Sequence, residues 1–280
     1  MKSYRQFITD PREIPSIVAH RGAWKVAPEN SVAAIEAAAD RGYEIVEIDA
    51  RRAADGGFFL MHDPGLERTT DRTGRAEDLP MSDLTATRLR QRDGGPDAPL
   101  TSHIIPTLSD ALRAARGRVY LDIDVKHERD LEEVADLIMA EGMTDQVDIK
   151  IDVQSGEDGD HLRALQRRFG VVVMPKTYFE RLTADDLMAV LSSTGAPIVE
   201  ATFDALTTIA ERREAFRNAG MSIWVNTLDP AACCGLDDRS AAEDPQSVWG
   251  VLMAAGASVV QTDTPENLLA YRQTVRRDGQ

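Results

Sequence analysis

The chain has 280 residues and a formal net charge of −15, from 47 acidic and 32 basic side chains. This length suits one large domain with a full core, and length alone is weak evidence for two domains. An acidic chain without clusters of Lys and Arg is a poor match for nucleic acid or an anionic membrane surface, so the composition favours a small-molecule partner.

The first residues, MKSYRQFITDPREIPS, lack the apolar segment of a signal peptide. No apolar run in the sequence approaches the roughly 18 residues of a membrane span. Cys233 and Cys234 are adjacent, which strains a disulfide between them and leaves a metal site incomplete, so we interpret them as free thiols. These features predict a cytoplasmic protein without stable membrane association, and they leave its oligomeric state open.

Strand and helix patterns alternate along the chain. Helical patterns that end at glycine, such as SVAAIEAAADRG, DLEEVADLIMAEG and TTIAERREAFRNAG, lie between short apolar or β-branched runs. Eight such runs joined by helical crossovers predict a (β/α)8 barrel. The strands are expected at 17–20, 44–49, 119–125, 146–151, 171–174, 197–201, 221–225 and 257–261.

The run FFLMHD at 58–63 does not fit a ninth parallel strand. A parallel crossover needs about a dozen residues or more, and only a short stretch with the turn signal DGG separates this run from the second strand. We predict an antiparallel return that places His62 roughly opposite Ala50 and beside Asp49. The polar segment from about 64 to 106 is then a small subdomain inserted in one crossover, on the C-terminal face of a single barrel domain covering 1–280.

Charged residues share one face of the second and third parallel strands. Glu47 and Asp49 are two residues apart, as are Asp122, Asp124 and Lys126, so each set lies on one side of its strand. Carboxylates that converge at one rim repel each other unless a cation lies between them. We therefore expect a hard divalent cation at Glu47, Asp49 and Asp124, and a buried ion pair at Asp122, which is lowest in its strand.

The first strand ends in HRG, a pattern with two interpretations. His20 is either an ordinary core histidine or, together with His62 at the same rim, half of a proton-transfer pair. An unperturbed pKa of about 6.5 makes both protonation states of a histidine accessible near neutrality. The neighbouring carboxylates favour the second interpretation.

These motifs carry a family resemblance. AHRG, PENS, EIDAR, DGGFFLMHD and LERTTDRTG, in this order and spacing, resemble the glycerophosphodiester phosphodiesterase family, and the likeness continues through LDIDVK, WVNT and QTDTPENL. The resemblance implies a barrel enzyme that hydrolyses a glycerophosphodiester to glycerol phosphate and an alcohol, using a divalent metal and two histidines. Carried onto this chain, it implies His20 and His62 as that pair, Arg21 as the phosphate-binding arginine, Glu47, Asp49 and Asp124 as metal ligands, and Lys126 as the family lysine.

Some positions depart from the family pattern. Asp124 stands where the family has Glu, so the metal must shift or a water must fill the gap. Lys150, Lys176 and Glu200 stand at strand ends where more neutral residues are expected; they either pair with one another or shape a pocket for the alcohol. Trp224 either stacks on the substrate or packs in the core. The remaining histidines are expected to be solvated: His103, His127 and His161.

The chemistry of a phosphodiester suits this set of residues. The substrate carries one negative charge and a poor leaving group, so cations at the phosphate and an acid–base pair are the expected tools. Mg²⁺ is expected rather than Ca²⁺, because few protein ligands are available. The nucleophile is either water or the substrate's own hydroxyl. Two alternatives are a lyase that stops at a cyclic phosphate, similar to sphingomyelinase D, and a barrel that binds phosphodiesters without turnover.

Overall fold

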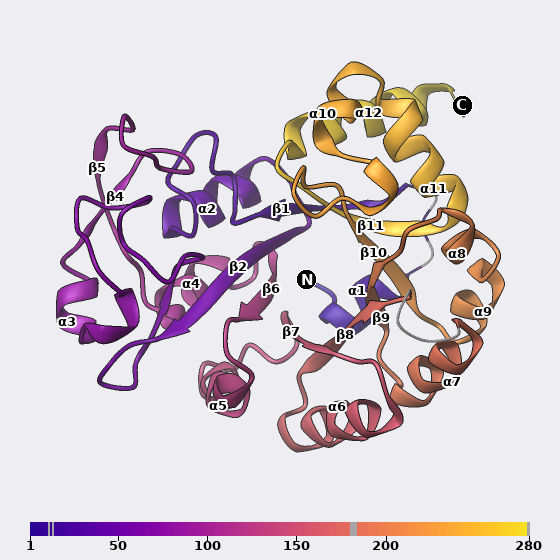
Figure 1. The fold of residues 1–280 in the computed structure, drawn as a ribbon, viewed down its shortest axis with the longest axis horizontal. Coiled ribbons are helices and arrows are strands. Elements are labelled where there is room, and N and C mark those ends of the chain that lie inside the picture. Colours follow the sequence, from indigo (N-terminus) through magenta and orange to yellow (C-terminus); the bar gives the residue numbers. More distant parts are fainter. Residues whose placement is uncertain (11, 13, 180–183, 279–280) are drawn as a thin grey trace. The chain divides into compact units, whose positions relative to one another are not determined.

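The computed structural model describes residues 1–10, 12, 14–179 and 184–278, which divide into two compact units. The first unit comprises residue 1 and residues 19–149. The second comprises residues 2–18 and the chain from residue 150 onward. Each unit contains strands with helices in the connections between them (Figure 1).

Among the described residues, eight strands correspond to the eight predicted ones. They are β1 (Ser16–His20), β2 (Ile45–Arg52), β6 (Tyr120–Val125), β7 (Val147–Asp152), β8 (Val172–Tyr178), β9 (Ile198–Thr202), β10 (Ser222–Asn226) and β11 (Ala257–Thr262). The strand order is β1-β11-β10-β9-β8-β7-β6-β2, and β1 also pairs with β2. The sheet therefore closes on itself, and the predicted (β/α)8 barrel is confirmed.

Short polar residues cap two helices of the first unit. The Ser31 hydroxyl accepts a hydrogen bond from the Ala34 amide at 3.0 Å, and Thr107 caps a later helix in the same way. Gly42 adopts φ +75° just after the first of these helices, as its position in the sequence predicts. Outside residues 64–106, the helices of this unit are α2 (Val32–Asp40), α4 (Leu108–Ala115), the 3-10 helix η2 (Glu128–Asp130) and α5 (Leu131–Ala140).

The run at 58–63 returns antiparallel to β2, as predicted, but in a different register. β3 (Phe58–Leu60) pairs Leu60 with Ala50. The predicted pairing of His62 with Ala50 is wrong by two residues, because the turn at 53–57 closes earlier along the chain. His62 thus lies beyond the end of the strand ladder.

The insertion that follows packs on this hairpin. Its elements are the 3-10 helix η1 (Ala76–Asp78), α3 (Met81–Leu84) and a separate antiparallel pair, β4 (Arg88–Arg90) with β5 (Leu100–Ile104). Phe59 and Met61 belong to one buried apolar cluster with insertion residues Leu66, Ala76, Leu84, Leu89 and Ile105. Burial of this cluster anchors the insertion to the segment that carries His62.

The second unit holds β8–β11 and most of the short helices. The pattern TTIAERREAFRNAG predicts one helix, but the structure has two, with Arg212 between them at φ −102° and ψ 3°. The β-branched run at 207–209 is a weak helix former, which favours the break. The helices are α1 (Tyr4–Ile8), α6 (Gly156–Phe169), α7 (Ala184–Thr194), α8 (Thr207–Ala210), α9 (Arg213–Asn218), η3 (Cys233–Gly235), α10 (Asp238–Glu243), the π-helical turn η4 (Gln246–Gly250), α11 (Val251–Ala255) and α12 (Pro265–Asp278).

Two further sequence expectations concern the whole chain. Cys233 and Cys234 are free thiols, as predicted. Across the described ranges, no helix combines the length and the apolar character needed to cross a bilayer.

Candidate active site

The first strand ends in a constrained backbone turn. Arg21 adopts φ +55°, a left-handed conformation that non-glycine residues rarely occupy, and its amide donates to Glu47 Oε2 at 3.2 Å. Gly22 follows at φ +84°, where a Cβ would lie 2.7 Å from Ala34 Cβ, so the position requires glycine. His20 Nε2 lies 3.9 Å from Glu47 Oε2. The backbone at HRG therefore places both His20 and Arg21 beside Glu47 of β2.

Three carboxylates come together as the strand pattern predicts. Glu47 and Asp49 alternate with apolar residues on β2, and the parallel register pairs Asp49 with Asp124 of β6. One ligand oxygen from each of Glu47, Asp49 and Asp124 lies within 4.8 Å of the others. Glu47 and Asp49 are 2% and 1% exposed. Burial of two acidic groups beside a third requires compensating positive charge.

Lys126 and Arg21 supply part of that charge. The Lys126 ammonium contacts Asp49 and lies 2.6 Å from Asp124 Oδ2, and Arg21 Nε lies 3.5 Å from Asp49 Oδ2. Burial alone would raise the pKa of Asp49, but the charges of Lys126 and Arg21 outweigh it and hold that pKa far below its ordinary value.

The same cluster fits a hard divalent cation. Its donors are all carboxylate oxygens, the ligand type that Mg²⁺ and Ca²⁺ prefer. An ammonium group bonds to two of the three carboxylates, which shows that the cluster attracts positive charge. Asp124, whose side chain is 25% exposed, is the most accessible of the three.

Asn30 holds Asp49 from both sides. Its Nδ2 donates to Asp49 Oδ2 at 2.6 Å, and its Oδ1 accepts from the Asp49 amide at 2.9 Å. Asn30 itself adopts φ +52°, which asparagine tolerates better than most residues. Sequence reasoning used PENS only for the resemblance and missed this role, although an asparagine in a turn before a helix was a visible signal.

His62 is oriented by its neighbour in the sequence. Its Nδ1 lies 2.7 Å from Asp63 Oδ1, so the imidazole donates Nδ1–H to the carboxylate and leaves Nε2 for proton transfer. Burial lowers the pKa of His62 below its ordinary value, against the opposing charge of Asp49. Burial opposes ionisation of Asp63, but hydrogen bonds from Arg68 and His62 outweigh it and lower the pKa of Asp63 to about 2.

Arg68 links the His62–Asp63 pair to Arg21 through Glu29. Its guanidinium donates to Asp63 Oδ2 at 2.6 Å and to both oxygens of Glu29 at 2.7 and 2.8 Å. Glu29 is 3% exposed and also accepts from Arg21 Nη1 at 3.2 Å. The chain Arg21–Glu29–Arg68–Asp63 therefore alternates in charge, and it ends at His62. Sequence reasoning missed Glu29, Asp63 and Arg68, all of which lie inside the motifs PENS, LMHD and LERTT.

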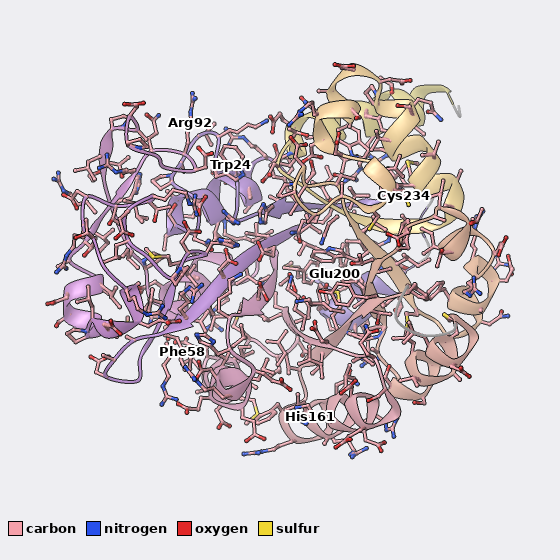
Figure 2. The ribbon with its side chains drawn as sticks, viewed as in Figure 1. Trp24, Phe58, Arg92, His161, Glu200 and Cys234 are labelled. Carbon is pink, nitrogen blue, oxygen red and sulfur yellow. The ribbon has the colours of Figure 1, made fainter. Side chains whose placement is uncertain are left out.

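The four remaining candidates lie in the second unit and share one strand position. Lys150, Lys176, Glu200 and Trp224 each stand two residues before the end of a strand, from β7 to β10. Lys176 and Trp224 are both in register with Glu200 on β9, which is labelled in Figure 2. These residues form one layer of the strands in this unit.

Hydrogen bonds tie part of this layer together. Lys150 Nζ lies 3.4 Å from Glu200 Oε2, and Asn226 Nδ2 donates to Glu200 Oε1 at 2.9 Å. Trp224 is fully buried, as its core interpretation expects, and its Nε1 donates to Asn226 Oδ1 at 2.8 Å. Lys176 pairs with Asp152 at 3.4 Å. Pairing within the set is thus shown for Lys150 with Glu200.

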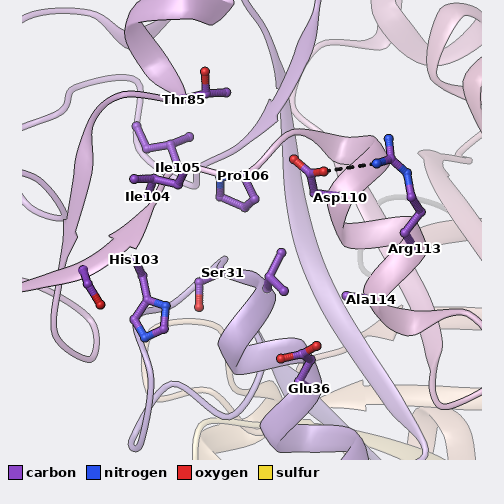
Figure 3. A pocket seen from close by; sticks show the side chains of 12 residues that line it. Ser31, Glu36, Thr85, His103, Ile104, Ile105, Pro106, Asp110, Arg113 and Ala114 are labelled. Carbon is purple, nitrogen blue, oxygen red and sulfur yellow. Dashed lines mark hydrogen bonds and ion pairs between the residues drawn. The ribbon is translucent and has the colours of Figure 1, made fainter.

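A groove of about 580 Å³ in the first unit contains none of the catalytic candidates. Figure 3 shows His103 and Ser31 beside it, with Asp110 and Arg113 of α4 joined by an ion pair. His103 is exposed, as predicted. His127 is partly exposed and bonds to Glu77 at 2.8 Å, so its ring is only partly solvated.

Two family models match the chain. The model of the glycerophosphoryl diester phosphodiesterase family matches residues 20–168, the range that holds every site residue of the first unit described above. A model described as a domain of unknown function matches residues 173–272.

Curated relatives match the chain in part. Glycerophosphodiester phosphodiesterase 1 of Mus musculus is 38% identical over 133 residues, which cover 46% of this chain and 39% of the relative. The protein of that name from Homo sapiens is 41% identical over 109 residues, covering 38% of this chain and 31% of the relative. The chain thus matches less than half the length of either protein.

Solved structures match over nearly the whole chain. A glycerophosphoryl diester phosphodiesterase from Parabacteroides distasonis shares the fold with a TM-score of 0.79 at 23% identity, covering 98% of this chain and 93% of that one. A glycerophosphodiester phosphodiesterase from Agrobacterium tumefaciens is 26% identical with a TM-score of 0.67, covering 92% and 100%. A phosphodiesterase from Oleispira antarctica, with a TM-score of 0.65 at 19% identity over 93% and 97%, was solved with the product sn-glycerol-3-phosphate.

Proposed function

This chain belongs to the glycerophosphoryl diester phosphodiesterase family, and we propose that it hydrolyses a glycerophosphodiester to glycerol phosphate and a free alcohol. The observation that carries the proposal is the meeting of three buried or half-buried carboxylates, two cationic side chains and two histidines in one unit. This set matches the needs of phosphodiester hydrolysis, which are charge neutralisation at the phosphate and two proton transfers.

We assign phosphate binding to Arg21 and Lys126. Both side chains are 15% exposed, so each presents a cation that is partly shielded from water. Glu47, Asp49 and Asp124 would hold a divalent cation, Mg²⁺ rather than Ca²⁺ because the protein offers few ligands. That ion would supply further charge stabilisation at the phosphate oxygens.

His20 and His62 are the proposed acid–base pair. One accepts the proton of the attacking hydroxyl, and the other donates a proton to the departing alkoxide. The bond from His62 Nδ1 to Asp63 supports its share of this role, because it fixes the tautomer and leaves Nε2 for the substrate. The backbone constraint at Arg21 and Gly22 supports the share of His20, because it fixes the end of β1.

We propose that the strand-end layer of the second unit is a polar binding site. Active sites of (β/α)8 enzymes lie at the carboxyl ends of the strands, and Lys150, Lys176, Glu200 and Trp224 stand there. Lys150 and Glu200 provide a donor and an acceptor, which suits a polar alcohol. Trp224 is fully buried and would act by holding Asn226 rather than by stacking on the ligand.

The proposed substrate is a deacylated diester that is dissolved in water, and the proposed location is the cytoplasm. Neither nucleic acid nor a membrane surface is expected as a partner, because the chain carries a net charge of −15. Cell fractionation tests the location. Turnover limited to intact phospholipid in vesicles would contradict the substrate class.

A panel of glycerophosphodiesters tests the function directly. Purified protein is incubated with diesters of choline, ethanolamine, inositol and glycerol, each with Mg²⁺, Ca²⁺, Mn²⁺ or excess chelator, and release of the free alcohol is measured. We expect release with at least one diester, dependence on a divalent ion, and incorporation of oxygen from labelled water into the phosphate product. A stable cyclic phosphate without solvent oxygen would show a lyase instead. No turnover of any diester would overturn the proposal.

A further inference from the structure

His62 lies just beyond the end of β3, outside the backbone pairing with β2. β3 ends at Leu60, and the Met61 amide makes the last bond towards β2, to the Asp49 carbonyl at 3.0 Å. The carbonyls of Met61 and His62 need other partners, because buried backbone acceptors are rarely left unpaired. Arg51, two residues after Asp49 on the same face of β2, provides them.

The Arg51 guanidinium bonds to both carbonyls. Nε lies 3.1 Å from the Met61 oxygen and 3.2 Å from the His62 oxygen, and Nη2 donates to the His62 oxygen at 2.6 Å. The planar fork of arginine suits this double contact, whereas a lysine ammonium cannot reproduce it. Arg51 is 8% exposed, so little water competes for these bonds.

The guanidinium is itself held by the insertion. Arg51 Nη1 donates to Glu77 Oε1 at 2.7 Å, and His127 Nε2 lies 2.8 Å from the same oxygen. Arg75 Nη2 donates to Glu77 Oε2 at 2.7 Å. Burial opposes ionisation of Glu77, but hydrogen bonds from His127 and Arg51 outweigh it and keep its pKa below the ordinary value. Both carboxylate oxygens of Glu77 are therefore hydrogen-bonded, and the three partners come from different parts of the chain.

We propose that Arg51 is a positioning residue for His62 and that Glu77 and His127 hold Arg51 in place, so that the insertion fixes the geometry of proton transfer. This inference rests on the proposed role of His62 in hydrolysis. The side chain of His62 is 40% exposed and its ring is tied to Asp63, the next residue along the same segment. A bond network that fixes the main chain of this segment therefore fixes the whole His62–Asp63 dyad relative to Asp49.

Kinetics of matched arginine variants test the inference. Arg51→Met removes the bonds to both carbonyls and keeps an apolar side chain in place of the arginine stem. Arg52→Met is the control, because Arg52 is on the same strand and pairs with Asp130 and Glu133 instead. We expect Arg51→Met to lower kcat at least about 10-fold with KM within about twofold, since small misplacements of reacting groups have such effects. Arg52→Met should match the parent enzyme in both constants.

A second set of variants separates positioning from folding. Glu77→Gln keeps an acceptor for Arg51 but loses the charge, and Arg51→Lys keeps the charge but loses the fork; both should lower kcat by several-fold in folded protein, as judged by thermal melts. The double variant Arg51→Met with Glu77→Gln should be no slower than Arg51→Met alone, because both act through one contact.

The possible failures are distinguishable. Absence of turnover in the parent enzyme sinks the proposed function. A parent enzyme that is active while Arg51→Met and Arg51→Lys keep the kcat of Arg52→Met overturns the positioning role. If Arg51→Met does not fold, folded Glu77→Gln and Arg51→Lys decide, and unchanged kcat in both overturns the inference.

Discussion

Two buried aspartates, Asp49 in the first unit and Asp238 in the second, have pKa values that shift in opposite directions. Asp49 is 1% exposed and Asp238 is 5% exposed. Both accept short hydrogen bonds, at 2.6 Å from Asn30 to Asp49 and at 2.6 Å from Thr227 to Asp238. The pKa of Asp49 is far below its ordinary value, whereas burial raises the pKa of Asp238 to about 6.

The difference follows from the charge of the neighbours. Asp49 faces the cations Lys126 and Arg21. Asp238 receives hydrogen bonds from the Thr227 and Thr262 hydroxyls and the Asp263 amide, which are neutral donors and offset burial only in part. Neutral hydrogen bonds therefore build a structural link between the ends of β10 and β11 and the start of α10. Neighbouring cations hold the pKa of a buried carboxyl group below its ordinary value, as at Asp49.

The largest expected effect comes from removing the proton-transfer pair beside the charged cluster. His20→Gln and His62→Gln should each lower kcat by about 10² to 10⁴-fold, the usual contribution of positioned acid–base groups. The double variant should be much less than additive, because both residues act on one transition state. Turnover and thermal melts are measured together, with His103→Gln as the control on an exposed strand.

The contrary outcome is specific. A large fall in melting temperature with near-normal specific activity of the folded His20→Gln protein would place His20 in the core and remove it from the mechanism.

Most of the fold was predictable because strand and helix periods are local. Every predicted parallel strand is present, and the antiparallel return of β3 followed from the short connection. The register of that hairpin was not predictable, because a shift of the turn by one residue changes every pairing. The break between α8 and α9 was also missed, since the apolar pattern continues across Arg212.

The candidate site was predictable where one strand supplies several residues. Glu47 and Asp49 share a face by period alone, and register brings Asp124 beside them. Residues that pair over long sequence separations were not predicted. Arg68 bonds to Glu29, 39 positions away, and Arg51 bonds to Glu77, 26 positions away. No local pattern shows which charge of an insertion will face which charge of a strand.

The next largest effect is expected on the free energy of unfolding when the buried pair of Arg68 and Glu29 is broken. Arg68→Met leaves Glu29 buried with less positive charge around it, and we expect a loss of about 3 kcal/mol in the free energy of unfolding. Adding Glu29→Gln should recover part of that loss, because it removes the uncompensated charge. Urea unfolding of both variants and the double variant measures this. Equal losses in Arg68→Met and the double variant would count against the argument.

Asp238 should make the protein less stable as pH rises, the opposite of a carboxyl group whose folded pKa is lowered. Its folded pKa of about 6 lies above the ordinary value of 3.8, so the native state binds more protons than the unfolded state between these values. The free energy of unfolding should therefore fall as pH rises from about 4 to 6, by at most about 3 kcal/mol from this group. Asp238→Asn removes this titration. The free energy of unfolding of the parent minus that of the variant should therefore fall as pH rises from about 4 to 6.

The neighbouring Asp237 provides the control for this experiment. It is a half-buried helix cap whose pKa is lowered by hydrogen bonds from Ser240. The difference between the parent and Asp237→Asn should rise with pH, because a lowered folded pKa stabilises the native state once the group ionises. A parent-minus-Asp238→Asn difference that is flat between pH 4 and 6 would contradict the neutral-donor explanation.

The smallest effect is expected where an equally short ion pair lies in water. Arg118 Nη2 lies 2.7 Å from Asp40 Oδ1, the same distance as Arg68 Nη2 from Glu29 Oε1. The Asp40 side chain is 71% exposed, whereas that of Glu29 is 3% exposed. Water solvates Asp40 when its partner is lost, so Arg118→Met should change the free energy of unfolding by less than about 1 kcal/mol. Methionine also keeps much of the apolar contact of the arginine stem. Urea unfolding of Arg118→Met beside Arg68→Met makes the comparison at constant distance, and equal losses in the two variants would show that burial of the carboxylate does not decide the effect.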